Sequence, residues 1–170
     1  MIGFPARNET APYYHRYIDR VHGNDVIQAL ETQFKELPRL FGAISEEKSL
    51  HRYGSDKWSI RQVLSHVNDC ERLFVFRAFW FARGFSTPLP SFDQDVAARG
   101  ADADATVWSK HSEEFLNIRT ATLSFFRNLP EDAWMRSGIA SDNPFTVRSL
   151  AYIAAGHAAH HVSILEERYL

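Results

Sequence analysis

The sequence predicts an all-α fold, a four-helix bundle that takes in the whole chain, residues 1–170, as a single domain. Four long stretches have apolar residues at the three- and four-residue spacing of an amphipathic helix, and segments with turn residues separate them. No stretch alternates with period two over enough residues to predict a sheet. Helices of roughly 20 residues are about 30 Å long, and they bury their apolar faces best against one another.

The first helix follows an N-terminal arm, residues 1–22, and is expected to begin after Gly23 with Asn24 or Asp25 as its cap. Pro38 lies inside the helical stretch. Because proline has no backbone N–H and its ring clashes with the preceding turn, we expect a kink or an early end there. The apolar positions that recur at helical spacing are Val26, Ile27, Leu30, Phe34, Leu37 and Phe41.

The second helix has the clearest start. Ser59 and Gln62 match a capping box, in which the two side chains satisfy two backbone N–H groups that would otherwise be unpaired. The apolar pattern continues to Arg83, and Gly84 is a natural end. Residues 85–106 contain two prolines and a glycine and have no sustained periodicity. They are predicted to form a long connection that can include a short turn of helix.

The third helix is predicted from about Val107 to Asn128, and Leu129-Pro130 ends it, because the residue before a proline avoids the helical conformation. Residues 130–145 form a second connection, in which a glycine and a proline interrupt regular structure. The fourth helix starts near Thr146, which is expected to cap it, and continues almost to the C-terminus.

Composition and charge exclude several classes of protein. The formal charge is −2, with 19 basic and 21 acidic residues spread along the chain. The sequence therefore lacks the basic stripe with which a protein binds nucleic-acid phosphates. No run of 18 apolar residues is present to span a bilayer, and the N-terminus lacks the apolar segment of a secretory signal. The lone Cys70 has no partner for an internal disulfide. We therefore expect a soluble, cytoplasmic protein that binds neither nucleic acid nor membrane.

Three histidines are candidate metal ligands. The fourth helix contains the run Gly156-His157-Ala158-Ala159-His160-His161. His161 lies within about 40° of His157 around the helix, on the same face as the apolar residues. Two imidazoles at positions i and i+4 can bind one cation, because their side chains lie one above the other. His66, on the flank of the apolar face of the second helix, is available as a third ligand.

Three neutral imidazoles leave at least one coordination position open, as in catalytic zinc sites, where water or substrate fills the vacancy. A structural site usually has four protein ligands, commonly cysteines, and this chain has only Cys70. An all-imidazole set suits one divalent transition metal: zinc or nickel first, with manganese or iron as further options. The alternative is that the histidines are hydrogen-bonded core residues or form a pH-sensitive core.

Several neighbours of these histidines have two interpretations each. The carboxylates of Asp69 and Glu71 either orient a ligand imidazole or form ion pairs with arginines on the surface of the same helix. His160 is either a general base beside the metal or a partly exposed residue at the edge of the apolar face. The candidate catalytic residues are therefore His160 and Asp69. Cys70 is expected to be a small buried residue. A tyrosine cluster is expected to pack the arm onto the bundle or onto a partner chain: Tyr13, Tyr14 and Tyr17.

The segments around the histidines resemble the DinB superfamily. The second helix opens with Lys57-Trp58-Ser59, has a histidine seven residues after the serine and continues with Asp-x-Glu-Arg at 69–72. The run at 155–161 and the ending Glu167-Arg168-Tyr169-Leu170 are similar to the last helix of that family. The similarity extends over nearly the whole chain. It implies an up-down-down-up four-helix bundle, a tendency to form homodimers, and a metal site whose ligands are His66, His157 and His161.

The same resemblance implies a function. The family includes metal-dependent hydrolases and low-molecular-weight-thiol S-transferases, so we expect an enzyme of one of these two kinds that acts on a small-molecule substrate. The alternative is a stress-associated metal-binding or interaction protein without turnover. The two differ in one structural feature, which is whether the open side of the metal faces a cavity large enough for a small molecule.

Overall fold

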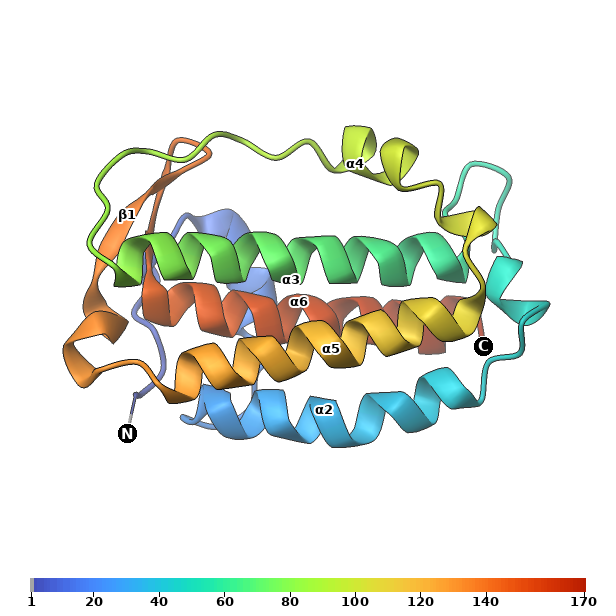
Figure 1. Ribbon diagram of the computed structural model, residues 1–170, viewed down its shortest axis with the longest axis horizontal. Helices are drawn as coiled ribbons and strands as arrows, with labels where there is room; N and C mark the ends of the chain where they lie inside the picture. The colour runs from blue at the N-terminus through green and yellow to red at the C-terminus, as the bar shows by residue number, and fades with distance from the viewer. Residues whose placement is uncertain (1) are drawn as a thin grey trace.

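The computed structural model describes residues 2–170 and contains four long helices, α2 (Val26–Gly42), α3 (Ile60–Ala82), α5 (Trp108–Arg127) and α6 (Val147–Arg168). Figure 1 shows that α2 and α6 run in one direction and α3 and α5 in the opposite direction. Helix α2 packs against α5 and α6, and α3 packs against the same two helices. The predicted four-helix bundle with up-down-down-up topology is therefore confirmed.

Three of the four long helices begin where the caps predict. Asp25 caps α2 by accepting hydrogen bonds from two backbone N–H groups of the first turn. Ser59 and Gln62 form the capping box of α3, and Thr146 caps α6. Gly84 follows the end of α3 with φ 84°, a left-handed conformation that glycine adopts without strain. Local capping chemistry thus sets the start of α2, α3 and α6.

Helix α2 runs through Pro38 to Gly42. Of the two outcomes expected at this proline, the early end is not observed. Leu37 and Phe41, on either side of Pro38, are both buried in the core. Their packing holds the chain helical although the proline removes one backbone hydrogen bond.

The second connection contains a short β-hairpin, so the expectation that the chain forms no sheet is wrong here. After a 3-10 turn, η5 (Glu131–Met135), strands β1 (Ser137–Ala140) and β2 (Asn143–Thr146) pair in antiparallel fashion. Ser141 and Asp142 form the turn with φ 49° and 58°, as a two-residue hairpin turn requires. Strands of four residues are too short to produce a recognisable alternation in the sequence.

The first connection crosses the outside of α3, as Figure 1 shows. It includes a short helix, α4 (Gln94–Ala101), and a 3-10 turn, η4 (Ala103–Ala105). Near its start, Leu89 exchanges two backbone hydrogen bonds with the hairpin, at 2.9 and 3.1 Å. The first connection and the hairpin therefore form a continuous cover over one side of the bundle. A further 3-10 turn, η3 (Lys48–Leu50), precedes α3.

The N-terminal arm packs onto the bundle, which is one of the two placements predicted for its tyrosines. It contains the 3-10 turns η1 (Arg7–Glu9) and η2 (Pro12–Tyr14) and the short helix α1 (His15–Ile18), which lies against α6. The buried carboxylate of Glu9 forms an ion pair with Arg148 and accepts a hydrogen bond of 2.7 Å from the hydroxyl of Thr146. These contacts fix the arm at the start of α6.

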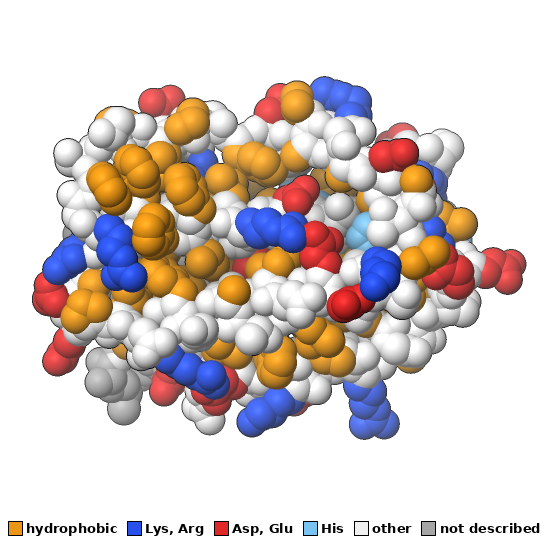
Figure 2. All heavy atoms as spheres, viewed as in Figure 1, with side chains coloured by type: hydrophobic (Ala, Val, Ile, Leu, Met, Phe, Trp, Pro, Cys, Tyr) orange, Lys and Arg blue, Asp and Glu red, His pale blue; other side chains and the backbone are white. Residues whose placement is uncertain are grey.

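The surface between α3 and α5 carries an apolar groove. Figure 2 shows hydrophobic side chains gathered on the left of this face, over the part of the molecule where Figure 1 draws the second half of both helices. The groove measures about 560 Å³ and includes Phe76 and Phe79, which are 47% and 39% exposed. Among residues 2–170, none of the helices has both the length and the hydropathy to cross a membrane.

Candidate metal centre

The candidate site lies between α3 and α6, two neighbouring helices that run antiparallel. His66 is about two turns into α3, counted from the Ser59 cap. His157 and His161 are one turn apart on α6, on the side that faces α3. The packing of the two helices therefore joins imidazoles that are 91 residues apart in the sequence.

The three imidazoles converge on one point. Each offers one nitrogen, and these three atoms all lie within 4.8 Å of one another. The Nε2 atoms of His66 and His157 are 3.2 Å apart. A tetrahedral ion with metal–nitrogen bonds of about 2.0–2.1 Å holds two ligand nitrogens about 3.3–3.4 Å apart. The ring centroid of His161 is 4.9 Å from that of His66 and 4.5 Å from that of His157.

Two neutral imidazoles joined by a hydrogen bond have a similar separation, so the 3.2 Å distance alone fits both interpretations of the histidines. The third imidazole adds a further donor to this pair. The ring of His161 has no hydrogen bond to any residue in the described part of the chain, although it lies against both other rings. Three converging donors of this kind fit one shared cation.

Burial keeps the three imidazoles neutral. Desolvation lowers the pKa of His66 to about 4 and that of His161 to about 3. It also lowers the pKa of His157 well below 6.5, and the neighbouring imidazoles lower it further. Metals bind the neutral form of imidazole. At pH 7 the site therefore has the protonation state that a metal ion needs.

Cys70 lies one turn after His66, and its Sγ is 3.6 Å from both ring nitrogens of that histidine. Burial raises the pKa of the Cys70 thiol to about 12. A thiol with that pKa stays protonated at neutral pH and is a poor nucleophile. Cys70 is the small buried residue that its position on α3 predicts.

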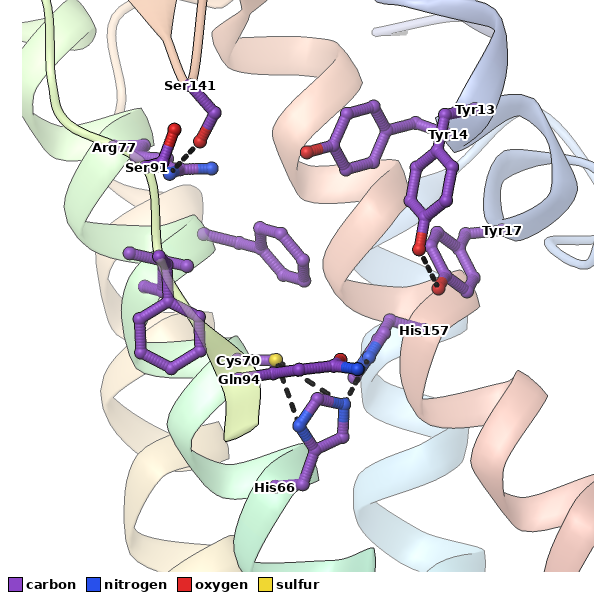
Figure 3. Close-up of a pocket in the computed structure, with 13 residues that line it drawn as sticks. Tyr13, Tyr14, Tyr17, His66, Cys70, Arg77, Ser91, Gln94, Ser141 and His157 are labelled. Atoms are coloured by element: carbon purple, nitrogen blue, oxygen red, sulfur yellow. Dashed lines mark hydrogen bonds between the residues drawn. The ribbon is translucent and has the colours of Figure 1, made fainter. Parts of the chain in front are cut away.

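A cavity of about 330 Å³ opens beside the histidines. Figure 3 shows His66 and His157 at one end, Arg77 and Ser141 at the other, and the tyrosines of the N-terminal arm along one side. The walls come from α1, the first connection and the hairpin as well as from α3 and α6. The complete lining is Tyr13, Tyr14, Tyr17, His66, Cys70, Leu73, Phe74, Arg77, Ser91, Phe92, Gln94, Ser141 and His157.

Sequence reasoning missed most of this lining. The sequence pattern assigns Arg77 no role at the site, and Ser141 and Gln94 lie in connections without a periodic pattern. One available signal was the spacing of Arg77, which lies eleven residues after His66. At about 100° per residue this places both residues near the same face of α3.

His161 faces a second opening. It lines a cleft of about 320 Å³ with Trp58, Asp95 and Tyr169, among others. Gln94, the first residue of α4, lines both this cleft and the larger cavity. Helix α4 therefore lies over the histidines between two routes of access.

The structure places the two candidate catalytic residues differently. The ring of His160 is partly buried, with its centroid 5.1 Å from that of His161 and 5.4 Å from that of Tyr17. Burial lowers the pKa of His160 below 6.5. Asp69 lies in a separate cleft, 3.5 Å from Arg72, and has no hydrogen bond to the three histidines within residues 2–170.

Glu71 takes neither of the roles that the sequence suggested, and this expectation is corrected. Its carboxylate is 2% exposed and forms a bidentate ion pair with Arg119 of α5, with oxygen–nitrogen distances of 2.8 and 2.7 Å. The reason is that this position of α3 faces α5. It faces neither solvent, where an arginine of the same helix would reach it, nor the imidazoles.

Gly156 allows the arm to approach α6 closely. A Cβ at this position would lie 1.9 Å from the carbonyl oxygen of Tyr17. We expect Gly156→Ala to lower the free energy of unfolding by about 1–3 kcal/mol, because the clash with fixed backbone outweighs the helix propensity of alanine. Urea denaturation measures this. Gly42→Ala, which meets nothing within 4 Å, is the matched control, and an equal loss in both variants would contradict the prediction.

In this chain, imidazoles from two helices of a four-helix bundle converge beside a cavity. The fold and the site together place it among helical-bundle proteins with a candidate metal centre. The sequence profile of the DinB superfamily matches residues 29–165. The chain therefore belongs to the DinB superfamily, and the resemblance of its motifs is confirmed. A comparison with curated protein sequences found no match.

Two solved structures are similar in fold. YfiT from Bacillus subtilis, described as a probable metal-dependent hydrolase with an unusual four-helix bundle topology, has a TM-score of 0.73 at 18% identity, with 84% of this chain and 82% of that chain aligned. The mycothiol-dependent maleylpyruvate isomerase has a TM-score of 0.63 at 13% identity, over 81% of this chain. The alignment spans 58% of the isomerase chain. At these identities the similarity establishes the fold.

Proposed function

We propose that this chain is a metal-dependent enzyme that holds one divalent transition metal through His66, His157 and His161 and acts on a small molecule in the adjoining cavity. The observation that carries the proposal is the convergence of three neutral imidazoles, with donor atoms within 4.8 Å of one another, at one end of a cavity of about 330 Å³. An all-imidazole donor set fits zinc or nickel, and also manganese or iron.

A divalent ion in such a site supplies Lewis acidity and makes a nucleophile available at neutral pH. The chain's own residues supply the rest. Burial keeps the imidazoles unprotonated, and Phe74 and the arm tyrosines form part of the cavity wall. His160 is proposed as the proton acceptor, since its ring lies against that of His161 and its lowered pKa keeps it neutral at pH 7. Asp69 lies in a separate cleft beside Arg72 and is proposed to orient that side chain.

Hydrolysis is the first reaction we propose, and transfer of a low-molecular-weight thiol is the second. The similarity to YfiT, a probable metal-dependent hydrolase, covers most of both chains, whereas the mycothiol-dependent isomerase is matched over 58% of its length. The cavity also supports turnover over a purely metal-binding role, because its volume falls within the range of small-molecule sites. The homodimer, the cytoplasmic location and any stress-associated role stay predictions.

Metal content tests the proposal directly. Untagged protein is incubated with zinc, nickel or manganese, desalted and analysed by plasma mass spectrometry. We expect about one equivalent of metal in the wild type and less than about a tenth of that in the His157→Ala, His161→Ala double variant, since two of three ligands are lost. His15→Ala, His22→Ala removes two histidines of the arm that lie outside the cluster and is the matched control. Wild-type protein that binds none of the three metals would overturn the proposal.

A further inference from the structure

Arg77 is a buried cation without a counter-charge. Arg77 is 2% exposed, yet no carboxylate within residues 2–170 lies within 4.0 Å of its guanidinium. The other two deeply buried arginines are neutralised: Arg119 by Glu71, and Arg61 by Glu46. Because a buried charge is costly unless an opposite charge pairs with it, Arg77 stands out among the arginines of this chain.

The hydrogen bonds of Arg77 give it a structural role but leave its charge uncompensated. Its Nη2 donates to the carbonyl oxygen of Pro90 at 3.1 Å and to the hydroxyl of Ser141 at 2.8 Å, which ties α3 to the first connection and to the hairpin. Both acceptors are neutral. The Nε is buried and has no hydrogen-bond partner in the described chain. Burial lowers the pKa of the Arg77 guanidinium, which expresses the cost of holding this charge alone.

The cavity around Arg77 offers nothing negative. None of the residues that line it is an aspartate or a glutamate, and Arg77 is its sole lysine or arginine. The groups near Arg77 in Figure 3 are neutral hydroxyls, including those of Ser91, Ser141 and Tyr14. Hydroxyls can donate hydrogen bonds to an anion as readily as they accept them. Charge and hydrogen-bond capacity at this end of the cavity therefore both suit an anionic group.

We propose that the Arg77 end of the cavity binds the carboxylate of the substrate. The substrate is then a small monocarboxylate whose apolar part lies along Leu73 and Phe74 and whose reacting group reaches the histidines. A guanidinium matches a carboxylate in shape, and its single positive charge balances the single negative charge of a carboxylate. A phosphate dianion carries two negative charges, which one guanidinium does not balance. This inference rests on the proposed function, because it names the class of substrate for the same cavity.

The spacing of the two ends of the cavity calls for an elongated molecule. His66 and Arg77 are eleven residues apart on α3, which corresponds to about 16 Å along the helix axis. Cys70, Leu73 and Phe74 line the cavity between them. A carboxylate at one end and a reacting centre at the other are therefore separated by an apolar stretch.

A binding titration on metal-free protein tests this inference separately from the metal site. The probes are 3-phenylpropionate, its neutral amide and phenyl phosphate, added to EDTA-treated 15N-labelled protein and followed by NMR. We expect the carboxylate to bind at least about 10-fold more tightly than the amide, as a hydrogen-bonded charge pair should. Equal binding of acid and amide would overturn the proposal, and tighter binding of phenyl phosphate would overturn the choice of a carboxylate.

Two variants locate the effect. Arg77→Met should reduce the ratio between acid and amide to about one, while Arg83→Gln, which removes an exposed arginine at the end of the same helix, should leave it unchanged. A preference that persists in Arg77→Met contradicts the inference. If this variant does not fold, the Nε–H resonance of Arg77 in the wild type decides, since it should shift with the acid and not with the amide. Metal content of folded Arg77→Met should stay at about one equivalent, so failure of the metal site and failure of the carboxylate site are distinguishable.

Discussion

Glu71→Ala is expected to lower the free energy of unfolding by about 3–5 kcal/mol, because it leaves the buried guanidinium of Arg119 without its counter-charge. Both side chains are almost completely excluded from solvent, with exposures of 2% and 0%. Water therefore cannot replace the lost carboxylate. A loss of this size is a large fraction of the stability of an ordinary domain.

The effect is large also because the ion pair connects the bundle. Arg119 of α5 donates to the side-chain oxygen of Gln33 of α2 at 2.6 Å, and Gln33 donates to the carbonyl oxygen of Ala155 of α6 at 2.8 Å. With Glu71 on α3, this chain of hydrogen bonds includes one group from each of the four long helices. Ala155 lies two residues before His157. The network thus holds the helix that carries two candidate ligands in position against its neighbours.

Urea denaturation of two further variants isolates the cause. Glu113→Ala removes an exposed carboxylate that pairs with Lys110 and should cost less than about 1 kcal/mol. Glu71→Leu combined with Arg119→Met removes both charges and should recover most of the stability lost in Glu71→Ala. If the double variant is as unstable as the single one, the unpaired charge is not the source of the loss.

The helices and the histidine cluster were predictable because local chemistry specifies them. The caps at Ser59 and Thr146 act within one turn, and the azimuth of His157 and His161 follows from helix geometry alone. The hairpin was not predictable in this way. Its strands of four residues owe their conformation to packing against α3 and to the two backbone hydrogen bonds with Leu89, which are long-range contacts.

The buried charged residues show a second limit of prediction from the sequence. A helical wheel gives the direction in which Glu71 or Arg77 points, but not which neighbouring element meets it there. Charged residues are usually exposed, so the sequence favours a surface position for both. The tertiary structure instead pairs Glu71 with Arg119 and aims Arg77 into a cavity whose walls come from the two connections and the arm. Such walls combine residues from distant segments, which no spacing rule relates.

Metal-free protein should lose stability as the pH falls from about 6.5 to about 4. In the unfolded chain a histidine has a pKa near 6.5, whereas burial lowers the pKa of His66 to about 4 in the folded state. Between these two values the unfolded chain binds a proton that the folded chain does not, so acid favours unfolding. For His66 alone the loss between pH 7.5 and 4.5 is on the order of 2–3 kcal/mol. His161, with a pKa of about 3, acts in the same direction.

Urea denaturation of EDTA-treated protein across this pH range measures the loss. His66→Gln should reduce the slope between pH 6.5 and 4 by up to one proton, while His22→Gln, on the exposed surface of the arm, is the matched control. An unchanged slope in His66→Gln would contradict the prediction. Added zinc then separates the two interpretations of the histidines. A shared metal site stabilises the protein at pH 7.5 and loses that stabilisation near pH 4, where protons compete for the imidazoles, whereas a merely pH-sensitive core responds to zinc at neither pH.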